Sequence, residues 1–98
     1  PSAPALIEAQ GRRYALAHAL GSQPEIRDEA EYMLTLRGDA ASALALAMRN
    51  FENQRDYEDV NLLQRAAKAA GRPDALEPMQ AWARSQQLDL PPLPGGGA

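Results

Sequence analysis

The chain has 98 residues, enough for one small domain, and it contains no cysteine, so disulfide bonds and thiolate metal sites are excluded. Its formal net charge of -3 argues against binding to nucleic acid or to an anionic membrane, because both need a basic surface. No apolar run approaches the roughly 20 residues needed to span a bilayer.

Alanine is abundant, and the only β-branched residues are Ile7, Ile26, Thr35 and Val60. Alanine is the best helix former, whereas β-branched side chains favour strands. The composition therefore predicts an all-α fold. Arginine outnumbers lysine, a bias typical of GC-rich bacterial genomes, and bacterial cytoplasm and periplasm both stay open. Because the chain begins with Pro1 rather than Met, we expect an excerpt of a longer protein or a processed form.

The first predicted helix spans residues 5–20 and follows a frayed segment at residues 1–4. Gly11 interrupts it, at a cost of about 1 kcal/mol relative to alanine. Its expected apolar face consists of Leu6, Ile7, Tyr14, Ala17 and Leu20.

The second predicted helix spans residues 25–37. The spacing of its apolar residues matches the helical period and places them on one face, and Gly38 ends the helix. The residues of that face are Ile26, Ala30, Met33 and Leu34.

The third and fourth helices are expected at residues 39–54 and 57–70, with Asp39 and Asp56 as their N-caps. The third is apolar over so much of its circumference that it should pack on two sides. Its apolar residues are Ala40, Ala43, Leu44, Leu46, Ala47, Met48 and Phe51, and those of the fourth helix are Val60, Leu63, Ala66, Ala67 and Ala70.

The fifth helix is expected at residues 74–87, with Trp82 in the core. Pro78 conflicts with a start at Asp74, because a proline within the helix removes a backbone bond, so a kink or a later start is the alternative. The proline- and glycine-rich segment 89–98 is predicted to be a disordered tail.

Two turns share a glycine that is soon followed by an Ala-Leu pair. They are Gly38-Asp39-x-x-x-Ala43-Leu44 and Gly71-Arg72-Pro73-Asp74-Ala75-Leu76. The first resembles the turn between the two helices of a tetratricopeptide repeat, and the second is similar with one residue deleted. A helix-turn-helix period of about 34 residues is typical of such arrays.

The resemblance covers residues 25–87, and the repeats are degenerate. Arg27 and Val60 stand where the family has a large aromatic residue, and Arg55 and Asp56 replace the proline between repeats. The resemblance implies a right-handed α-solenoid of antiparallel helix pairs over residues 5–88. It also implies a concave surface that binds proteins or peptides, with no chemistry and no cofactor.

A candidate binding surface lies on the fourth helix, where Asn61, Arg65 and Lys68 share one face. A cationic wall with an amide donor can hold a peptide carboxylate through charge-assisted hydrogen bonds. The alternative is an ordinary solvated face. By the same resemblance, the neighbouring strip of the groove on the second helix is Glu25, Asp28, Tyr32 and Thr35.

No pattern of catalytic or metal-binding residues stands out. His18 is the only histidine and has no paired ligand spacing, so it is interpreted as a structural or surface residue. The proline-rich segment 91–94 has PxxP spacing, but a linker or tail is the favoured interpretation.

The sequence therefore predicts a non-enzymatic interaction scaffold. The alternative is a C-terminal capping segment of a longer helical array, with no ligand of its own. Because the first helix resembles half of a repeat, its exposed apolar surface is also expected to favour self-association.

Overall fold

The structure, a computed structural model, describes residues 2–22 and 25–88. These residues form five α-helices and contain no β-strand, which confirms the predicted all-α class. A π-helical turn continues α2, and a short 3-10 helix leads into α5. The elements are α1 (Ala3–Ala19), α2 (Ile26–Glu31), η1 (Tyr32–Leu36), α3 (Ala40–Phe51), α4 (Tyr57–Ala69), η2 (Pro73–Leu76) and α5 (Glu77–Ser85).

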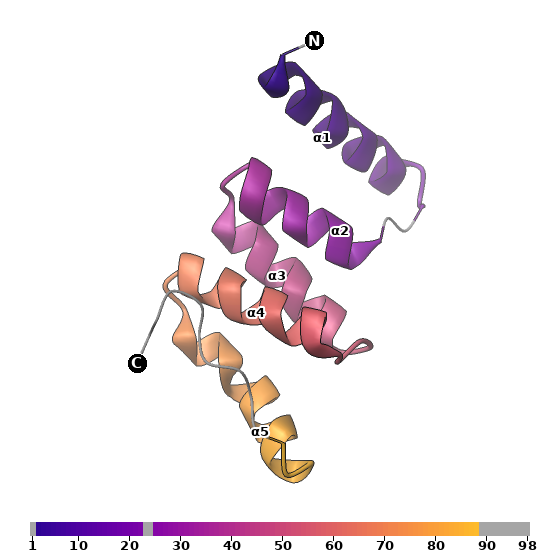
Figure 1. Cartoon of the computed structure of the whole chain (residues 1–98). Coiled ribbons are helices and arrows are strands. Elements are labelled where there is room, and N and C mark those ends of the chain that lie inside the picture. The colour runs from indigo at the N-terminus through magenta and orange to yellow at the C-terminus, as the bar shows by residue number, and fades with distance from the viewer. Residues whose placement is uncertain (1, 23–24, 89–98) are drawn as a thin grey trace.

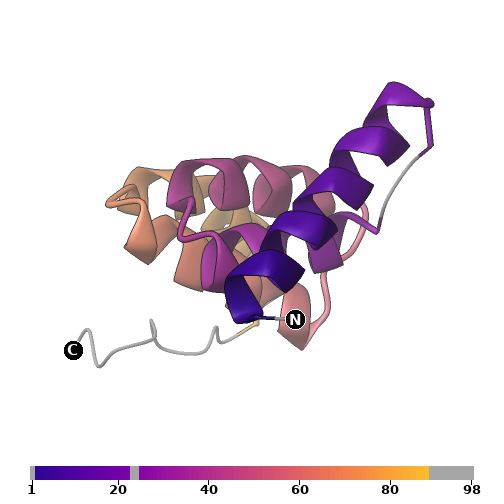
Figure 2. The same cartoon turned by 90° about the horizontal axis from the view of Figure 1, so that it is seen from above.

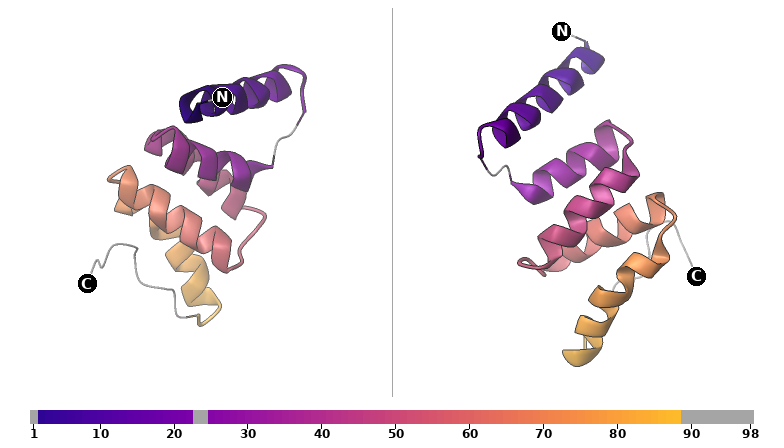
Figure 3. Two further views of the ribbon diagram at one scale, coloured as in Figure 1. Left: turned by 45° about the horizontal axis from the view of Figure 1, so that its top comes forward. Right: turned by 180° about the vertical axis from the view of Figure 1, so that it is seen from behind.

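The helices lie side by side in chain order, from α1 at one end to α5 at the other (Figures 1 and 3). The molecule is consequently elongated and measures 45 × 29 × 19 Å. Helix α3 packs against both α2 and α4, as its broad apolar surface predicts. Seen from above, α1 is set at an angle to the other helices (Figure 2).

The core is formed by α2, α3, α4, η2 and α5, and no residue of α1 is fully buried. Leu62 and Met79 are its largest fully buried apolar side chains, each worth about 1.5–3 kcal/mol of burial. Alanines fill the remaining contacts and allow the helices to approach closely. The core residues are Ala30, Ala43, Leu44, Ala47, Phe51, Val60, Leu62, Leu63, Ala66, Ala67, Ala75, Leu76 and Met79.

Two matching turns follow the second and fourth helices. Gly38 has φ 66° and Gly71 has φ 67°, a left-handed conformation that glycine adopts without steric cost. The residue after each glycine donates its backbone N–H to a carbonyl of the preceding helix at 2.8 Å: Asp39 to Met33, six residues back, and Arg72 to Ala67, five residues back. The helix before Gly71 therefore ends in a Schellman cap, and the helix before Gly38 ends in a related cap that is one residue wider.

The helix before Gly38 widens at η1. The Thr35 hydroxyl donates to the Glu31 carbonyl at 2.7 Å, and the Arg37 N–H reaches back five residues to the Tyr32 carbonyl at 3.1 Å. Such side-chain bonds compete with the backbone ladder and distort helices. The widened turn is a local departure from the regular helix expected at residues 25–37.

A buried carboxylate, Asp59, joins three helices. Its Oδ1 accepts from Asn50 Nδ2 of α3 at 2.7 Å and from Arg27 Nη1 of α2 at 3.3 Å. Its Oδ2 accepts from the Asp56 N–H at 3.1 Å, and this bond forms half of a capping box at the start of α4. Burial acts to raise the pKa of Asp59, but these hydrogen bonds and Arg27 outweigh it and hold the pKa below its ordinary value.

Helix α1 is held mainly by polar and aromatic contacts. The Tyr32 hydroxyl donates to the Ile7 carbonyl at 2.7 Å, and the Tyr32 ring lies 5.2 Å from that of Tyr14. His18 Nε2 lies 3.0 Å from Glu29 Oε1, so this histidine has a structural partner. Gly11 also faces Tyr32, because a Cβ there would lie 2.7 Å from the tyrosine hydroxyl.

The expected apolar face of α1 was partly wrong. Ile7 and Tyr14 lie on the face that docks, as expected, together with Gly11. Leu6 and Leu20 do not, since they are 55% and 72% exposed. Helix α1 begins at Ala3, two residues earlier than expected, and Ser2 caps it through its Oγ, which accepts from the Ala5 N–H at 3.2 Å.

The third and fifth helices differ from their expected bounds. Helix α3 ends at Phe51 rather than at residue 54, and Arg55 Nε donates to the Phe51 carbonyl at 2.9 Å. Before α5, residues 73–76 form η2, so Pro78 is the second residue of α5, where a missing N–H costs little. This is the later start that the sequence left open. The predicted tail at 89–98 lies outside the described residues.

Candidate interaction surfaces

The predicted groove residues meet only in part. A hollow of about 330 Å³ lies between α2 and α4, and it brings together Asp28, Asn61 and Arg65 of the predicted set. Three carboxylates and two guanidinium groups line it, so its charge is mixed rather than cationic. Its lining residues are Arg27, Asp28, Glu31, Tyr57, Glu58, Asn61 and Arg65.

Arg65 is already bound within the chain. Its guanidinium pairs with both carboxylate oxygens of Glu31, with Nη1 at 3.2 Å from Oε2, and its Nε donates to Asn61 Oδ1 at 2.8 Å. Glu31 therefore occupies the position that was expected for a peptide carboxylate. Sequence reasoning missed this pair because its members lie 34 residues apart.

Arg27, the other cation of this hollow, is also surrounded by acids. It lies 3.3 Å from Glu58, 3.3 Å from Asp59 and 3.7 Å from Asp56. An incoming carboxylate would meet three negative groups here as well. The α2–α4 hollow thus offers a poor environment for an acidic peptide terminus.

The remaining predicted residues lie elsewhere. Tyr32 is buried and donates its hydroxyl to the Ile7 carbonyl of α1, and the Thr35 hydroxyl donates to the Glu31 carbonyl. Tyr32 and Thr35 both line a second hollow of about 410 Å³ beside α1. Glu25 is exposed before α2, and Lys68 is exposed in the last turn of α4. Neither of these two lines the α2–α4 hollow.

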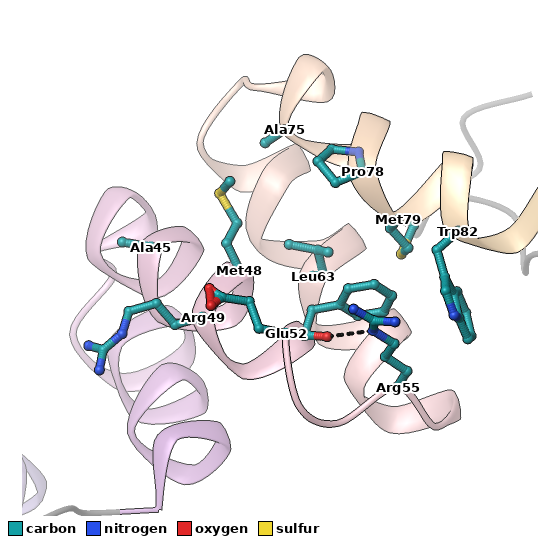
Figure 4. A pocket seen from close by; sticks show the side chains of 11 residues that line it. Ala45, Met48, Arg49, Glu52, Arg55, Leu63, Ala75, Pro78, Met79 and Trp82 are labelled. Carbon is teal, nitrogen blue, oxygen red and sulfur yellow. Dashed lines mark hydrogen bonds between the residues drawn. The ribbon is translucent and has the colours of Figure 1, made fainter.

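A larger and more apolar groove lies between α3 and α5, with a volume of about 550 Å³ (Figure 4). Leu63 of α4 also lines it, and Met48, which is 40% exposed, stands on the α3 side. We call this surface the α3–α5 groove. Its lining residues are Ala45, Met48, Arg49, Phe51, Glu52, Arg55, Leu63, Ala75, Pro78, Met79 and Trp82.

The aromatic wall of the α3–α5 groove is held in place by defined contacts. Phe51 and Trp82 meet edge to face, with ring centroids 5.4 Å apart and planes at 84°. The Arg55 guanidinium lies 5.2 Å from the Phe51 centroid and 5.6 Å from the Trp82 centroid. The sequence assigned Phe51 and Trp82 to the core, and only the structure reveals that they also border an open groove.

The described residues contain neither a cluster of metal ligands nor a helix that could span a membrane. In ranges 2–22 and 25–88, no group of three or more His, Cys, Asp or Glu side chains is placed to hold a metal ion. None of the helices described is both long and apolar enough to cross a bilayer.

Comparison with models of known families, with curated proteins and with solved structures gives no match for this chain. The candidate surfaces are therefore judged by their geometry and chemistry.

Proposed function

We propose that this chain is a non-enzymatic interaction scaffold, built as a tetratricopeptide-like array of antiparallel helix pairs. The repetition of one turn supports this proposal. Gly38 and Gly71 lie 33 positions apart (71 − 38) and have nearly the same φ. Each is followed by an Ala-Leu pair that is buried in the core. In this proposal α2 pairs with α3, α4 pairs with η2–α5, and α1 is the second helix of a preceding pair.

The observation that carries the binding proposal is the apolar α3–α5 groove. Ligand sites are typically concave and apolar with a few polar groups, and this groove combines an aromatic wall with the charged rim residues Arg49, Glu52 and Arg55. Met48 and Met79 add side chains that adapt to varied ligand shapes. The ligand that fits is an extended protein segment with apolar side chains.

The predicted concave surface between α2 and α4 is the weaker candidate for an acidic ligand. A peptide carboxylate would have to displace Glu31 from Arg65 and so break a two-pronged ion pair. A partner that approaches this surface is better matched if it carries a basic residue, because carboxylates outnumber guanidinium groups in the hollow.

The alternative function is a C-terminal capping segment without a ligand. A terminal helix of an array needs a polar outer face, and the exposed residues Glu77, Arg84 and Ser85 of α5 meet that need. The two functions differ in the groove, since a capping segment has no use for an open apolar surface beside its last helix.

A capture experiment distinguishes these functions. The full chain is compared with Met48→Glu, which places a charge in the α3–α5 groove, and with Ala81→Glu, which places the same charge on an exposed site of α5 outside it. We expect a protein retained by the wild type and by Ala81→Glu and lost by Met48→Glu. Loss in Arg65→Glu/Lys68→Glu alone would assign binding to the α2–α4 surface, and no specific band in any lane would favour the capping function.

A further inference from the structure

We propose that the α3–α5 groove binds a protein segment that carries an Asp or Glu side chain beside its apolar residues, and that Arg55 holds this carboxylate. The inference rests on the proposed function, because it uses the same groove and names the polar anchor of its ligand. Two properties single out Arg55: its guanidinium group is fixed in place, and its charge is not neutralised.

Arg55 is fixed by one hydrogen bond and two aromatic rings. Its Nε donates to the Phe51 carbonyl at 2.9 Å, and its guanidinium carbon lies 5.2 Å from the Phe51 centroid and 5.6 Å from the Trp82 centroid. A planar guanidinium group held in this way loses little further freedom when its two Nη groups bind a carboxylate. Arg55 is therefore preorganised to bind an anion.

Within residues 2–22 and 25–88, Arg55 forms no ion pair, although acidic residues outnumber basic ones in this chain. Glu52 lines the same groove, but its carboxylate points away from Arg55 (Figure 4). Other arginines of the chain are paired with a carboxylate. These paired residues are Arg27, Arg37, Arg65, Arg72 and Arg84.

The charge balance of the groove points to the same kind of ligand. Two arginines, Arg49 and Arg55, and a single carboxylate, Glu52, line the α3–α5 groove. The α2–α4 hollow has the opposite balance, with three carboxylates and two guanidinium groups. A segment that is both apolar and acidic is thus complementary to the α3–α5 groove alone of these two surfaces.

The apolar lining makes the anchor selective. Met48, Pro78 and Trp82 offer apolar surface next to Arg55. A segment that covers these side chains also excludes water from the contact between Arg55 and the carboxylate, and the attraction between the two charges rises as water is removed. An acidic segment without apolar side chains should therefore bind poorly.

A purely structural role of Arg55 is the competing explanation. Its Nε bond to the Phe51 carbonyl closes the end of α3, where a positive charge is favourable. That role uses only Nε, whereas the binding role uses the two Nη groups. The two roles differ in whether the charge on the ligand matters.

A peptide selection followed by titration tests the binding role. Peptides are selected from a random dodecapeptide library on the full wild-type chain, and those that change the emission of Trp82 are kept. Trp82 reports on the groove because it is the only tryptophan of the chain and lines this surface. Each peptide is then titrated in its acidic form and with Asn or Gln in place of the acidic residue.

Three chains are titrated: wild type, Arg55→Gln and the matched control Arg84→Gln. Arg84 lies on α5, pairs with Glu77 and does not line the groove. Circular dichroism verifies that the helical content of the variants is unchanged. If Arg55→Gln does not fold, the two peptide forms are compared on the wild-type chain at low and high salt.

We expect the selected peptides to carry Asp or Glu beside apolar residues. Replacement of the acidic residue by its amide should raise the Kd about three- to tenfold for the wild type and for Arg84→Gln, and should leave the Kd unchanged for Arg55→Gln. Added salt should weaken the acidic form more than the amide form. Equal weakening of both peptide forms by Arg55→Gln would overturn the proposal, because it is the result of a structural role.

The outcome is separable from that of the proposed function. Peptides that change Trp82 emission without a preference for acidic residues would overturn this inference and leave the groove as a binding surface for apolar segments. A library from which no peptide changes Trp82 emission would contradict the groove itself, and with it both proposals.

Discussion

Arg65 on α4 binds both carboxylate oxygens of Glu31 on α2 through its two Nη groups. Its Nε donates a third hydrogen bond to Asn61 Oδ1. The side chains of Arg65 and Glu31 are 29% and 39% exposed, so the pair lies at the protein surface and is partly solvated. It fixes the spacing of the two helices that form the predicted concave surface.

Removal of this pair should cost little stability. We expect Glu31→Gln and Arg65→Gln each to lower the free energy of unfolding, with a coupling energy of about 0.5–1 kcal/mol in the double-mutant cycle, because solvent screens a half-exposed pair. Urea denaturation of the four proteins measures this coupling. A coupling near zero would mean that the contact does not hold α2 and α4 together in solution.

The buried Asp59 should matter more. In Asp59→Asn an amide N–H₂ replaces one accepting oxygen, so either the Asp56 N–H loses its acceptor or both Asn50 and Arg27 lose theirs. We expect a loss of about 2–4 kcal/mol in the free energy of unfolding, as for other buried charges that lose a partner. Asp39→Ala, at an exposed N-cap, is the comparison and should cost only about 1 kcal/mol.

The same residue makes stability depend on pH. Because the pKa of folded Asp59 lies below its ordinary value of 3.8, the stabilisation is fully present above that value and is lost as pH falls through the folded pKa. The stability difference between wild type and Asp59→Asn should therefore shrink between about pH 5 and pH 2. A difference that stays constant over this range would contradict the assigned role.

At Gly11 an alanine would favour the helical conformation but would clash with the Tyr32 side chain. Alanine there would gain about 1 kcal/mol in helix propensity. Its Cβ would however displace the buried Tyr32 hydroxyl from the Ile7 carbonyl and disturb the ring contact with Tyr14, two interactions of about 1 kcal/mol each.

We therefore expect Gly11→Ala to loosen α1, seen as faster amide hydrogen exchange in that helix. In a Tyr32→Phe background the obstructing oxygen is absent, and the same substitution should slow exchange instead. Slower exchange in the wild-type background would show that propensity outweighs the contact.

Much of the fold follows from local chemistry that is visible in the sequence. The turns at Gly38 and Gly71 were predictable because only glycine adopts their φ without strain. Pro78 was correctly identified as incompatible with a regular helix from residue 74, and η2 is the structural solution.

The surfaces were less predictable, because they depend on contacts between distant residues. The side chain that neutralises Arg65 lies 34 positions away. Similarly, Leu6 and Leu20 fit a helical apolar pattern, yet Tyr32 docks on a different side of α1. The groove beside Trp82 arises because α3 and α5 are separated in space. The periodicity of apolar residues does not predict how far apart two helices lie.

The exposed leucines of α1 predict weak self-association. Leu6, Leu16 and Leu20 are exposed, and at the helical period they fall within about 80° of arc. Sedimentation equilibrium should give a mass that rises with concentration for the wild type and a monomer mass for Leu16→Glu/Leu20→Glu. A wild-type chain that stays monomeric at all concentrations would leave α1 without this role.

The most direct test of the interaction scaffold is photocrosslinking from position 48 in cells that express the full chain. A photoreactive residue replaces Met48 in the α3–α5 groove, and Ala81 and Asn61 carry the same residue in parallel chains. We predict a discrete adduct with another protein from position 48 and none from position 81. Adducts from position 61 alone, or from none of the three positions, would contradict the assignment of the groove as the binding surface.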